Sequence, residues 1–191
     1  MVRLWKLEPA SSPPRRIVIL DRDGVLNQDP GHVGHAHEFV WNEGAIEAVK
    51  WLNENGLGVV VATNQAGIAK GIYSERDFSH LMSWVQAELE GHGARLDGVY
   101  FCPHHPSEGG HPVACSCRKP APGMLLEILA DFEARPEDCV MIGDKPSDEA
   151  AADAAGIRAV LFTGGSLLAT VRAAVRGWTE APGDTPSRQG L

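Results

Sequence analysis

The sequence has few of the features that mark membrane proteins, disulfide-linked proteins and nucleic-acid-binding proteins. No apolar run approaches the roughly 20 residues that a membrane span needs, and the opening stretch "MVRLWKLEPASSPPRR" has no apolar signal core. Only 4 of the 191 residues are cysteine. The 17 basic side chains face 25 acidic ones, so the net charge of −8 repels nucleic acid and anionic membranes. We therefore expect a cytoplasmic protein with no nucleic-acid or membrane partner, whose cysteines stay reduced.

Short apolar runs alternate with segments of helical periodicity along most of the chain. The apolar runs are 16–20, 57–63, 98–101, 139–143 and 157–162. Helical periodicity follows Asn42 and Ser74, the expected N-caps, and returns in 124–132 and before Gly156. Apolar residues make up 43% of the chain, which is enough for one core. This alternation predicts one α/β domain with a parallel sheet covered by helices on both faces and ligands at the C-terminal strand ends.

Polar side chains follow four of these segments, where a strand or the loop behind it ends. They are Asp21 and Asp23, then Thr63 and Asn64, then Arg118 and Lys119, and finally Asp144 and Lys145. In a parallel sheet they should converge in space although they are far apart in sequence. Two or three carboxylates suit Mg²⁺, which takes oxygen ligands and leaves room for water and phosphate. The remaining hydroxyl, amide and ammonium groups can donate to phosphate oxygens.

This set of residues suits phosphoryl transfer. Asp21, at a strand tip, is placed to attack phosphorus, and Asp23 can protonate the leaving oxygen and then activate water. Lys119 would offset the negative charge that gathers there. Each residue alone could be a turn, a helix cap or a solvated side chain, but four such coincidences together are improbable. A phospho-receiver signalling module uses similar residues, yet the second aspartate favours turnover of the phosphate over its storage.

The segment "FCPHHPSEGGHPVACSCRKP", residues 101–120, is too rich in glycine and proline for a helix or a strand. It offers four soft ligands in two short pairs, as a closed tetrahedral Zn²⁺ site requires: Cys102, His104, Cys115 and Cys117. His105 and His111 remain as spare or exchanged ligands. Zinc would fix the loop and thereby place Arg118 and Lys119, which follow the last cysteine, against the phosphate site.

Four stretches, "VILDRDGVLN", "VVATNQAGIAKG", "CRKPAPGM" and "VMIGDKPSD", resemble the haloacid dehalogenase (HAD) superfamily of phosphohydrolases. With "CPHH" and "CSCRKP", the likeness narrows to the D-glycero-D-manno-heptose 1,7-bisphosphate phosphatases and the related histidinol phosphatases. It covers about 17–162 and implies a three-layer Rossmann-like HAD fold with a zinc-stabilised loop at 102–117 and no cap domain. We expect an N-terminal extension at 1–15, the phosphatase domain at 16–178 and a disordered tail at 179–191.

The resemblance also implies roles for individual residues. Asp21 would be the nucleophile and Asp23 the general acid/base, with Asp21, the Asp23 carbonyl and Asp144 on Mg²⁺. The expected substrate contacts are Asp29, His32, Thr63, Asn64, Gln65, Arg118, Lys119 and Lys145. The flap at 28–38 carries His32 where similar proteins have a tyrosine.

The function that the resemblance implies is a Mg²⁺-dependent phosphatase acting through an aspartyl-phosphate. Its expected substrate is a small phosphorylated sugar, the C7 phosphate of heptose 1,7-bisphosphate, with Arg118 as the partner of a second anionic group. Histidinol phosphate is the nearest alternative. We expect a monomer with an open site.

Overall fold

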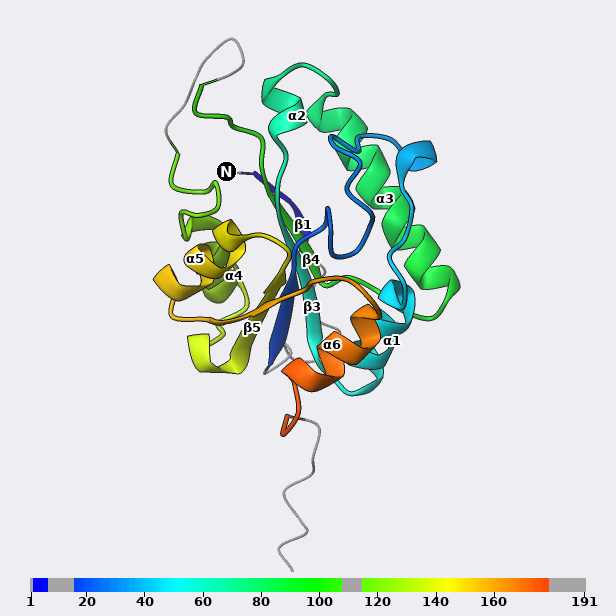
Figure 1. Ribbon diagram of the computed structural model, residues 1–191, viewed down its shortest axis with the longest axis vertical. Helices are drawn as coiled ribbons and strands as arrows, with labels where there is room; N and C mark the ends of the chain where they lie inside the picture. Colours follow the sequence, from blue (N-terminus) through cyan, green and yellow to red (C-terminus); the bar gives the residue numbers. More distant parts are fainter. Residues whose placement is uncertain (1, 7–15, 108–114, 179–191) are drawn as a thin grey trace, which may run out of the picture.

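The structure is a computed structural model that describes residues 2–6, 16–107 and 115–178 (Figure 1). In these ranges the strands form one six-stranded sheet in the order β1-β4-β3-β2-β5-β6. They are β1 (Val2–Lys6), β2 (Ile17–Leu20), β3 (Gly58–Asn64), β4 (Gly98–Cys102), β5 (Cys139–Gly143) and β6 (Arg158–Leu161). All pairings among the five strands from β2 through β6 are parallel: β2 pairs with β3 and β5, β3 with β4, and β5 with β6. These pairings confirm the predicted parallel sheet. β1, antiparallel to β4, was not predicted and brings part of the N-terminal extension into the sheet.

Helices cover both faces of the sheet, as predicted. The helices α1 (Ala45–Glu54), α3 (Glu75–Gly91) and α6 (Leu167–Ala174) pack on one face, and α4 (Gly123–Asp131) and α5 (Pro146–Ala154) pack on the other (Figure 1). The short helices α2 (Ala66–Ala69), η1 (Ala36–Glu38) and η2 (Pro136–Asp138) lie in connections. The result is the expected three-layer α/β arrangement.

The central strand β2 has an apolar residue at every position. Val18 and Leu20 join the core under α1, α3 and α6, whereas Ile17 and Ile19 join the core under α4 and α5. Successive side chains of a strand point to opposite faces, so a strand covered on both faces has no polar position. Burying a side chain of this size contributes about 1.5–3 kcal/mol. The polar residue that follows β2, Asp21, therefore stands on a well-packed support.

The entry to α1 differs from the prediction. The helix begins at Ala45 with Gly44 as its N-cap, so the assignment of Asn42 as the N-cap is wrong. The Asn42 side-chain amide instead donates to the carbonyls of Gly24 and Val25, at 3.0 and 2.9 Å. A longer-range contact thus outweighs the local capping preference, and it ties the loop after β2 to the segment before α1. The N-cap predicted for α3, Ser74, is confirmed.

The connections after β2 and β3 consist of loops and helices that pack on the sheet. No separate cap domain is inserted in the parts of the chain described above. Among these same residues, no helix combines the length and the apolar character needed to cross a membrane. The C-terminal ends of β2, β3 and β5 therefore share one edge of the sheet that is free to bind a ligand.

Candidate active site

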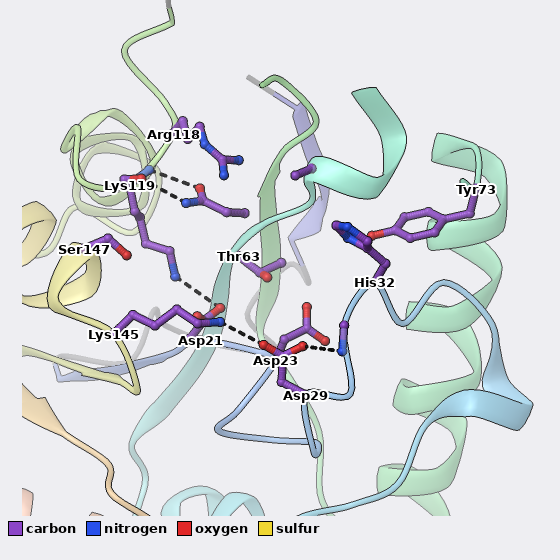
Figure 2. A pocket seen from close by; sticks show the side chains of 13 residues that line it. Asp21, Asp23, Asp29, His32, Thr63, Tyr73, Arg118, Lys119, Lys145 and Ser147 are labelled. Carbon is purple, nitrogen blue, oxygen red and sulfur yellow. Dashed lines mark hydrogen bonds and ion pairs between the residues drawn. The ribbon is translucent and has the colours of Figure 1, made fainter. Parts of the chain in front are cut away.

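A cavity of about 400 Å³ lies at the C-terminal edge of the sheet (Figure 2). It occupies the point where β2 separates β3 from β5, the place where open α/β sheets bind ligands. Its lining residues are Asp21, Asp23, Asp29, Gly31, His32, Thr63, Asn64, Ala66, Tyr73, Arg118, Lys119, Lys145 and Ser147. Seven of the eight polar residues predicted from the strand ends are thus brought together from distant parts of the sequence, and Asp144 is the one that does not line the cavity.

Asp21 is the first residue after β2. Its backbone N–H donates to the Ile142 carbonyl at 2.9 Å, which extends the pairing with β5 by one residue. Burial raises the pKa of the Asp21 carboxyl to about 6, although the ammonium of Lys119, 3.1 Å from Oδ1, acts in the opposite direction. A buried carboxyl group with a perturbed pKa and one close cation is typical of a functional site in a cleft.

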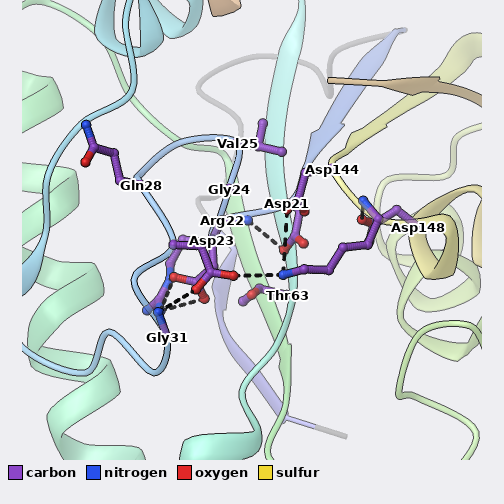
Figure 3. A network of polar contacts seen from close by, with 12 residues as sticks. Asp21, Arg22, Asp23, Gly24, Val25, Gln28, Gly31, Thr63, Asp144 and Asp148 are labelled. Carbon is purple, nitrogen blue, oxygen red and sulfur yellow. Dashed lines mark hydrogen bonds and ion pairs between the residues drawn. The ribbon is translucent and has the colours of Figure 1, made fainter. Parts of the chain in front are cut away.

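Three carboxylates form a cluster beside the cavity. Asp21, Asp144 after β5 and Asp148 in the first turn of α5 each bring an oxygen within 4.8 Å of the others (Figure 3). Asp144 Oδ1 is buried and has no hydrogen-bond partner in the protein, and burial raises the pKa of this carboxyl group. An orphaned buried carboxylate oxygen beside two more carboxylates fits a hard cation such as Mg²⁺.

Sequence reasoning missed Asp148. The signal was present, because "GDKPSD" places a second carboxylate four residues after Asp144 at the start of a helix. Two glycines make room for the cluster: a Cβ on Gly24, whose φ is +90, would collide with Asp144, and a Cβ on Gly143 would collide with Asp148. Larger residues at these positions would push the carboxylates apart.

The Asp23 carboxylate lies outside this cluster and is held by three side chains. Arg22, which is fully buried, donates through Nη2 to both carboxylate oxygens at 2.7 Å and through Nε to Oδ1 at 3.1 Å. Asn27 donates to Oδ1 at 3.1 Å, and Gln65 donates to Oδ2 at 3.0 Å. The role of Arg22 was not foreseen. The metal contact through the Asp23 carbonyl stays a prediction.

Lys119 lies between the predicted nucleophile, Asp21, and the carboxylate of Asp148. Its ammonium lies 3.1 Å from Asp21 Oδ1 and 2.6 Å from Asp148 Oδ1, and it donates to the Ala62 carbonyl at 2.8 Å. Asn64 holds the backbone of Lys119 with both ends of its amide, donating to the carbonyl at 2.9 Å and accepting from the N–H at 3.1 Å. The end of β3 therefore fixes the residue that follows the cysteine-rich loop.

The rim of the cavity carries charged groups from the flap, α5 and the loop before α4. Lys145 pairs with Asp29 at 2.9 Å. Burial alone would raise the pKa of the Asp29 carboxyl group. The hydrogen bond and the charge of Lys145 have the opposite effect, and the pKa is lowered overall. His32 lines the cavity with a left-handed φ of 47. Arg118 also lines it and donates to the His104 carbonyl at 3.1 Å.

Gln65 does not face the cavity, so the structure does not place it where the predicted substrate contact requires. Its side chain is 1% exposed, donates to the Thr63 hydroxyl at 2.8 Å and accepts from the Tyr73 hydroxyl at 2.6 Å. The residue follows the end of β3, and its amide turns inward to buried polar partners. Tyr73, which lines the cavity, was not predicted because nothing in its local sequence marks it as a site residue.

The cysteine and histidine cluster has the membership that the spacing predicted: Cys102, His104, Cys115 and Cys117. Neighbouring ligand atoms are 3.3 to 3.6 Å apart. Two thiolates on a tetrahedral ion with 2.3 Å bonds lie about 3.8 Å apart, so the four groups fit Zn²⁺ with modest adjustment. His105 accepts from the Ser107 backbone and lies outside the cluster. His111 falls outside the described residues.

Comparisons with known proteins agree with this geometry. A family model described as HAD-hydrolase-like matches residues 116–184. The chain is 42% identical over 146 residues to the D-glycero-beta-D-manno-heptose-1,7-bisphosphate 7-phosphatase of Haemophilus ducreyi, covering 75% of this chain and 80% of the relative. It is 41% identical over 165 residues to the corresponding alpha-heptose enzyme of Burkholderia mallei, covering 84% and 87%.

Solved structures show the same likeness. The D,D-heptose 1,7-bisphosphate phosphatase of B. bronchiseptica, complexed with magnesium and phosphate, superposes with a TM-score of 0.72 at 31% identity, covering 83% of this chain and 86% of that one. A HAD-like phosphatase from Mesorhizobium loti superposes with a TM-score of 0.79 at 28% identity, covering 93% and 94%.

Proposed function

This chain belongs to the family of D-glycero-D-manno-heptose-1,7-bisphosphate 7-phosphatases, and we propose that it removes the C7 phosphate from a heptose 1,7-bisphosphate. One observation carries the proposal: a single cavity has a buried Asp21–Lys119 pair at its base and Arg118 and Lys145 at its rim. A bisphosphate requires both features, because one phosphate reacts while the other must be held by separate cations.

In the first step, a carboxylate oxygen of Asp21 attacks the phosphorus of the C7 phosphate. The bond between phosphorus and the C7 oxygen breaks, and Asp23 gives that oxygen a proton, so that the sugar leaves as an alcohol. The Thr63 hydroxyl and the Lys119 ammonium hold the phosphoryl oxygens during the transfer. The product of this step is an aspartyl-phosphate on Asp21.

In the second step, Asp23 accepts a proton from a water molecule that attacks the aspartyl-phosphate. The bond between phosphorus and the Asp21 oxygen breaks, which releases inorganic phosphate and restores the carboxylate. Arg22 holds the Asp23 carboxyl group in place through an ion pair at 2.7 Å.

The carboxylate cluster is the proposed Mg²⁺ site. Asp21 and Asp144 would hold the ion together with the Asp23 carbonyl, and Asp148 would hold Lys119 in place and complete the negative charge of the site. When bound, Mg²⁺ supplies positive charge beside the phosphoryl oxygens. The magnesium and phosphate found together in the solved relative from B. bronchiseptica support this assignment.

The cysteine and histidine cluster is the proposed structural Zn²⁺ site. Its four ligands would close the coordination shell, which leaves no position for a reacting water. The ligand Cys117 is directly followed by Arg118 and Lys119, and Arg118 is also tied to the carbonyl of the ligand His104. Zinc binding would therefore fix the loop that delivers both cations to the cavity.

The charges of the rim favour a bisphosphate over histidinol phosphate. Lys145 is paired with Asp29, whereas Arg118 contacts a neutral carbonyl, and its guanidinium fork can bind two phosphate oxygens at once. Histidinol phosphate has no second phosphate and carries an ammonium group instead. The positive charge of Arg118 disfavours that group.

A phosphate-release assay with three substrates tests the proposal. The substrates are the α and β anomers of D-glycero-D-manno-heptose 1,7-bisphosphate and histidinol phosphate, each with Mg²⁺. Relatives are named for both anomers, so both are included. We expect kcat/KM for one anomer to exceed that for histidinol phosphate by at least about 100-fold, the discrimination that a paired second phosphate can provide. Faster turnover of histidinol phosphate would contradict the proposal.

A further inference from the structure

A chain of hydrogen bonds connects Tyr73 to Asp23. The Tyr73 hydroxyl donates to Gln65 Oε1 at 2.6 Å, and Gln65 Nε2 donates to Asp23 Oδ2 at 3.0 Å and to the Thr63 hydroxyl at 2.8 Å. An ionised carboxylate can only accept hydrogen bonds, so the amide nitrogen must face Asp23 and the amide oxygen must face Tyr73. The tyrosine hydroxyl therefore fixes the orientation of the amide.

The Tyr73 ring is held in a slot between two segments that border the cavity. A Cβ on Gly34, in the flap, or on Gly67, in α2, would collide with the ring. The tyrosine is 6% exposed, and burial raises the pKa of its hydroxyl to about 12. The hydroxyl therefore stays protonated at neutral pH and remains a hydrogen-bond donor to Gln65.

We propose that Gln65 and Tyr73 are positioning residues that orient the Asp23 carboxyl group for proton transfer to the leaving oxygen. This inference rests on the proposed function. Arg22 contacts Asp23 as an ion pair at 2.7 Å. A neutral amide can keep its hydrogen bond in both protonation states, since a protonated carboxyl group still has an acceptor oxygen. Asn27 and Gln65 both donate to Asp23 through such an amide, to Oδ1 and Oδ2 respectively, and the amide of Gln65 is the one that the Tyr73 hydroxyl orients.

The dependence on the leaving group separates positioning of an acid from a general structural role. A sugar alkoxide needs a proton in order to leave, whereas 4-nitrophenolate leaves without one. We expect Tyr73→Phe and Gln65→Met to lower kcat/KM for the heptose bisphosphate by about 10- to 100-fold, part of the contribution of a general acid. The value for 4-nitrophenyl phosphate should fall by less than about 3-fold, because that leaving group needs little acid assistance.

A matched control is Tyr100→Phe. Tyr100 is also buried, and its hydroxyl donates to Asp131 Oδ2 at 2.6 Å, but it lies in the core under α4 and α5. This variant should keep the wild-type ratio of the two kcat/KM values. A second control adds Tyr73→Phe to Asp23→Asn, where the further loss should be less than about 2-fold because the positioned acid is already gone.

Three outcomes would overturn the inference. Equal losses for both substrates would show that Tyr73 and Gln65 support the fold or the phosphoryl site rather than the acid. Wild-type kcat/KM values for both substrates in both variants would show that Asp23 needs no such support. An inactive wild type would overturn the proposed function together with the inference, and it differs from the first two outcomes because in those the wild type turns over both substrates.

Discussion

The two candidate metal clusters of this protein are built in opposite ways. The cysteine and histidine cluster comes from one stretch, 102–117, and its four ligand groups contact mainly one another. The carboxylate cluster comes from the ends of β2 and β5 and from α5, and the ammonium of Lys119 lies against two of its three members. One cluster has four soft ligand groups, the number that a closed tetrahedral shell needs, whereas the other has hard ligand groups and a lysine ammonium against them.

This difference indicates a division of roles. Soft thiolates bind Zn²⁺ tightly, and a closed tetrahedral shell suits a permanent structural ion. Carboxylates that already share a lysine bind Mg²⁺ less tightly, which suits an ion that assists the reaction and exchanges with solvent. Mutations in the first cluster should therefore act mainly through the placement of the loop, and mutations in the second should act on the chemical step.

The largest effect is expected for Asp21→Asn. An amide is a poor nucleophile, so kcat/KM should fall by about 10⁴- to 10⁶-fold while the fold is retained, as judged by circular dichroism. The matched control is Asp97→Asn, since Asp97 has the same 6% exposure but accepts from the Val59 N–H at the other end of the sheet. Near-normal activity of the Asp21 variant would exclude the covalent mechanism.

The next largest effect on kcat/KM is expected for Asp148→Asn. Asp148 is the carboxylate that was not predicted from the sequence. The substitution removes the charge 2.6 Å from the Lys119 ammonium, so that lysine would shift toward Asp21 and compete with the metal. We expect kcat/KM to fall by about 100- to 1000-fold, together with a higher Mg²⁺ concentration at half-maximal activity. An unchanged Mg²⁺ dependence would remove Asp148 from the account of the metal site.

A smaller effect is expected for Arg118→Ala. Arg118 donates to the carbonyl of His104, a member of the cysteine and histidine cluster, and also lines the cavity. Hydrogen bonds to charged groups contribute about 1.5–3 kcal/mol, so kcat/KM for the bisphosphate should fall by about 10- to 100-fold. A generic monophosphate should lose little. The control is Arg135→Ala, a surface arginine paired with Asp138. If both substrates lose activity equally while zinc is retained, Arg118 does not bind the second phosphate.

The smallest effect on activity is expected for Cys117→Ser. The same substitution should abolish zinc binding. Elemental analysis should find about one zinc per wild-type chain and none in the variant. Activity should fall by about 10-fold, because the loop loses its support rather than a reacting group. Cys139→Ser, a buried cysteine in β5 outside the cluster, should keep its zinc. The absence of zinc from wild-type protein that was purified without a chelator would contradict the assignment.

The two clusters also differ in how well they could be predicted from sequence. The members of the cysteine and histidine cluster were predicted completely, because their spacing along one loop is itself the signal. Asp21, Thr63 and Lys119 followed from the rule that a parallel sheet gathers its strand ends. Asp148 was missed although "GDKPSD" carries a signal for it, and Arg22 was missed although it precedes its partner Asp23 in the sequence. Tyr73 was missed because its link to Asp23 passes through Gln65, a connection that only the fold makes.

Other differences have the same physical origin. Gln65 was predicted as a substrate contact, but its amide turns inward to Asp23, Thr63 and Tyr73. The strand β1 was missed because its short segment carries no strong period, and its pairing with β4 is a long-range contact. The predicted tail at 179–191 lies outside the described residues.

Phosphorus NMR of the heptose bisphosphate reaction tests the central claim, removal of the C7 phosphate at the carboxylate cluster, most directly. With Mg²⁺ present, the account predicts that the C7 phosphorus signal is converted to inorganic phosphate while the C1 phosphate signal persists in the product. Asp21→Asn should leave both signals unchanged. Release of the C1 phosphate first, or release of the C7 phosphate by the Asp21→Asn variant at the wild-type rate, would contradict the account.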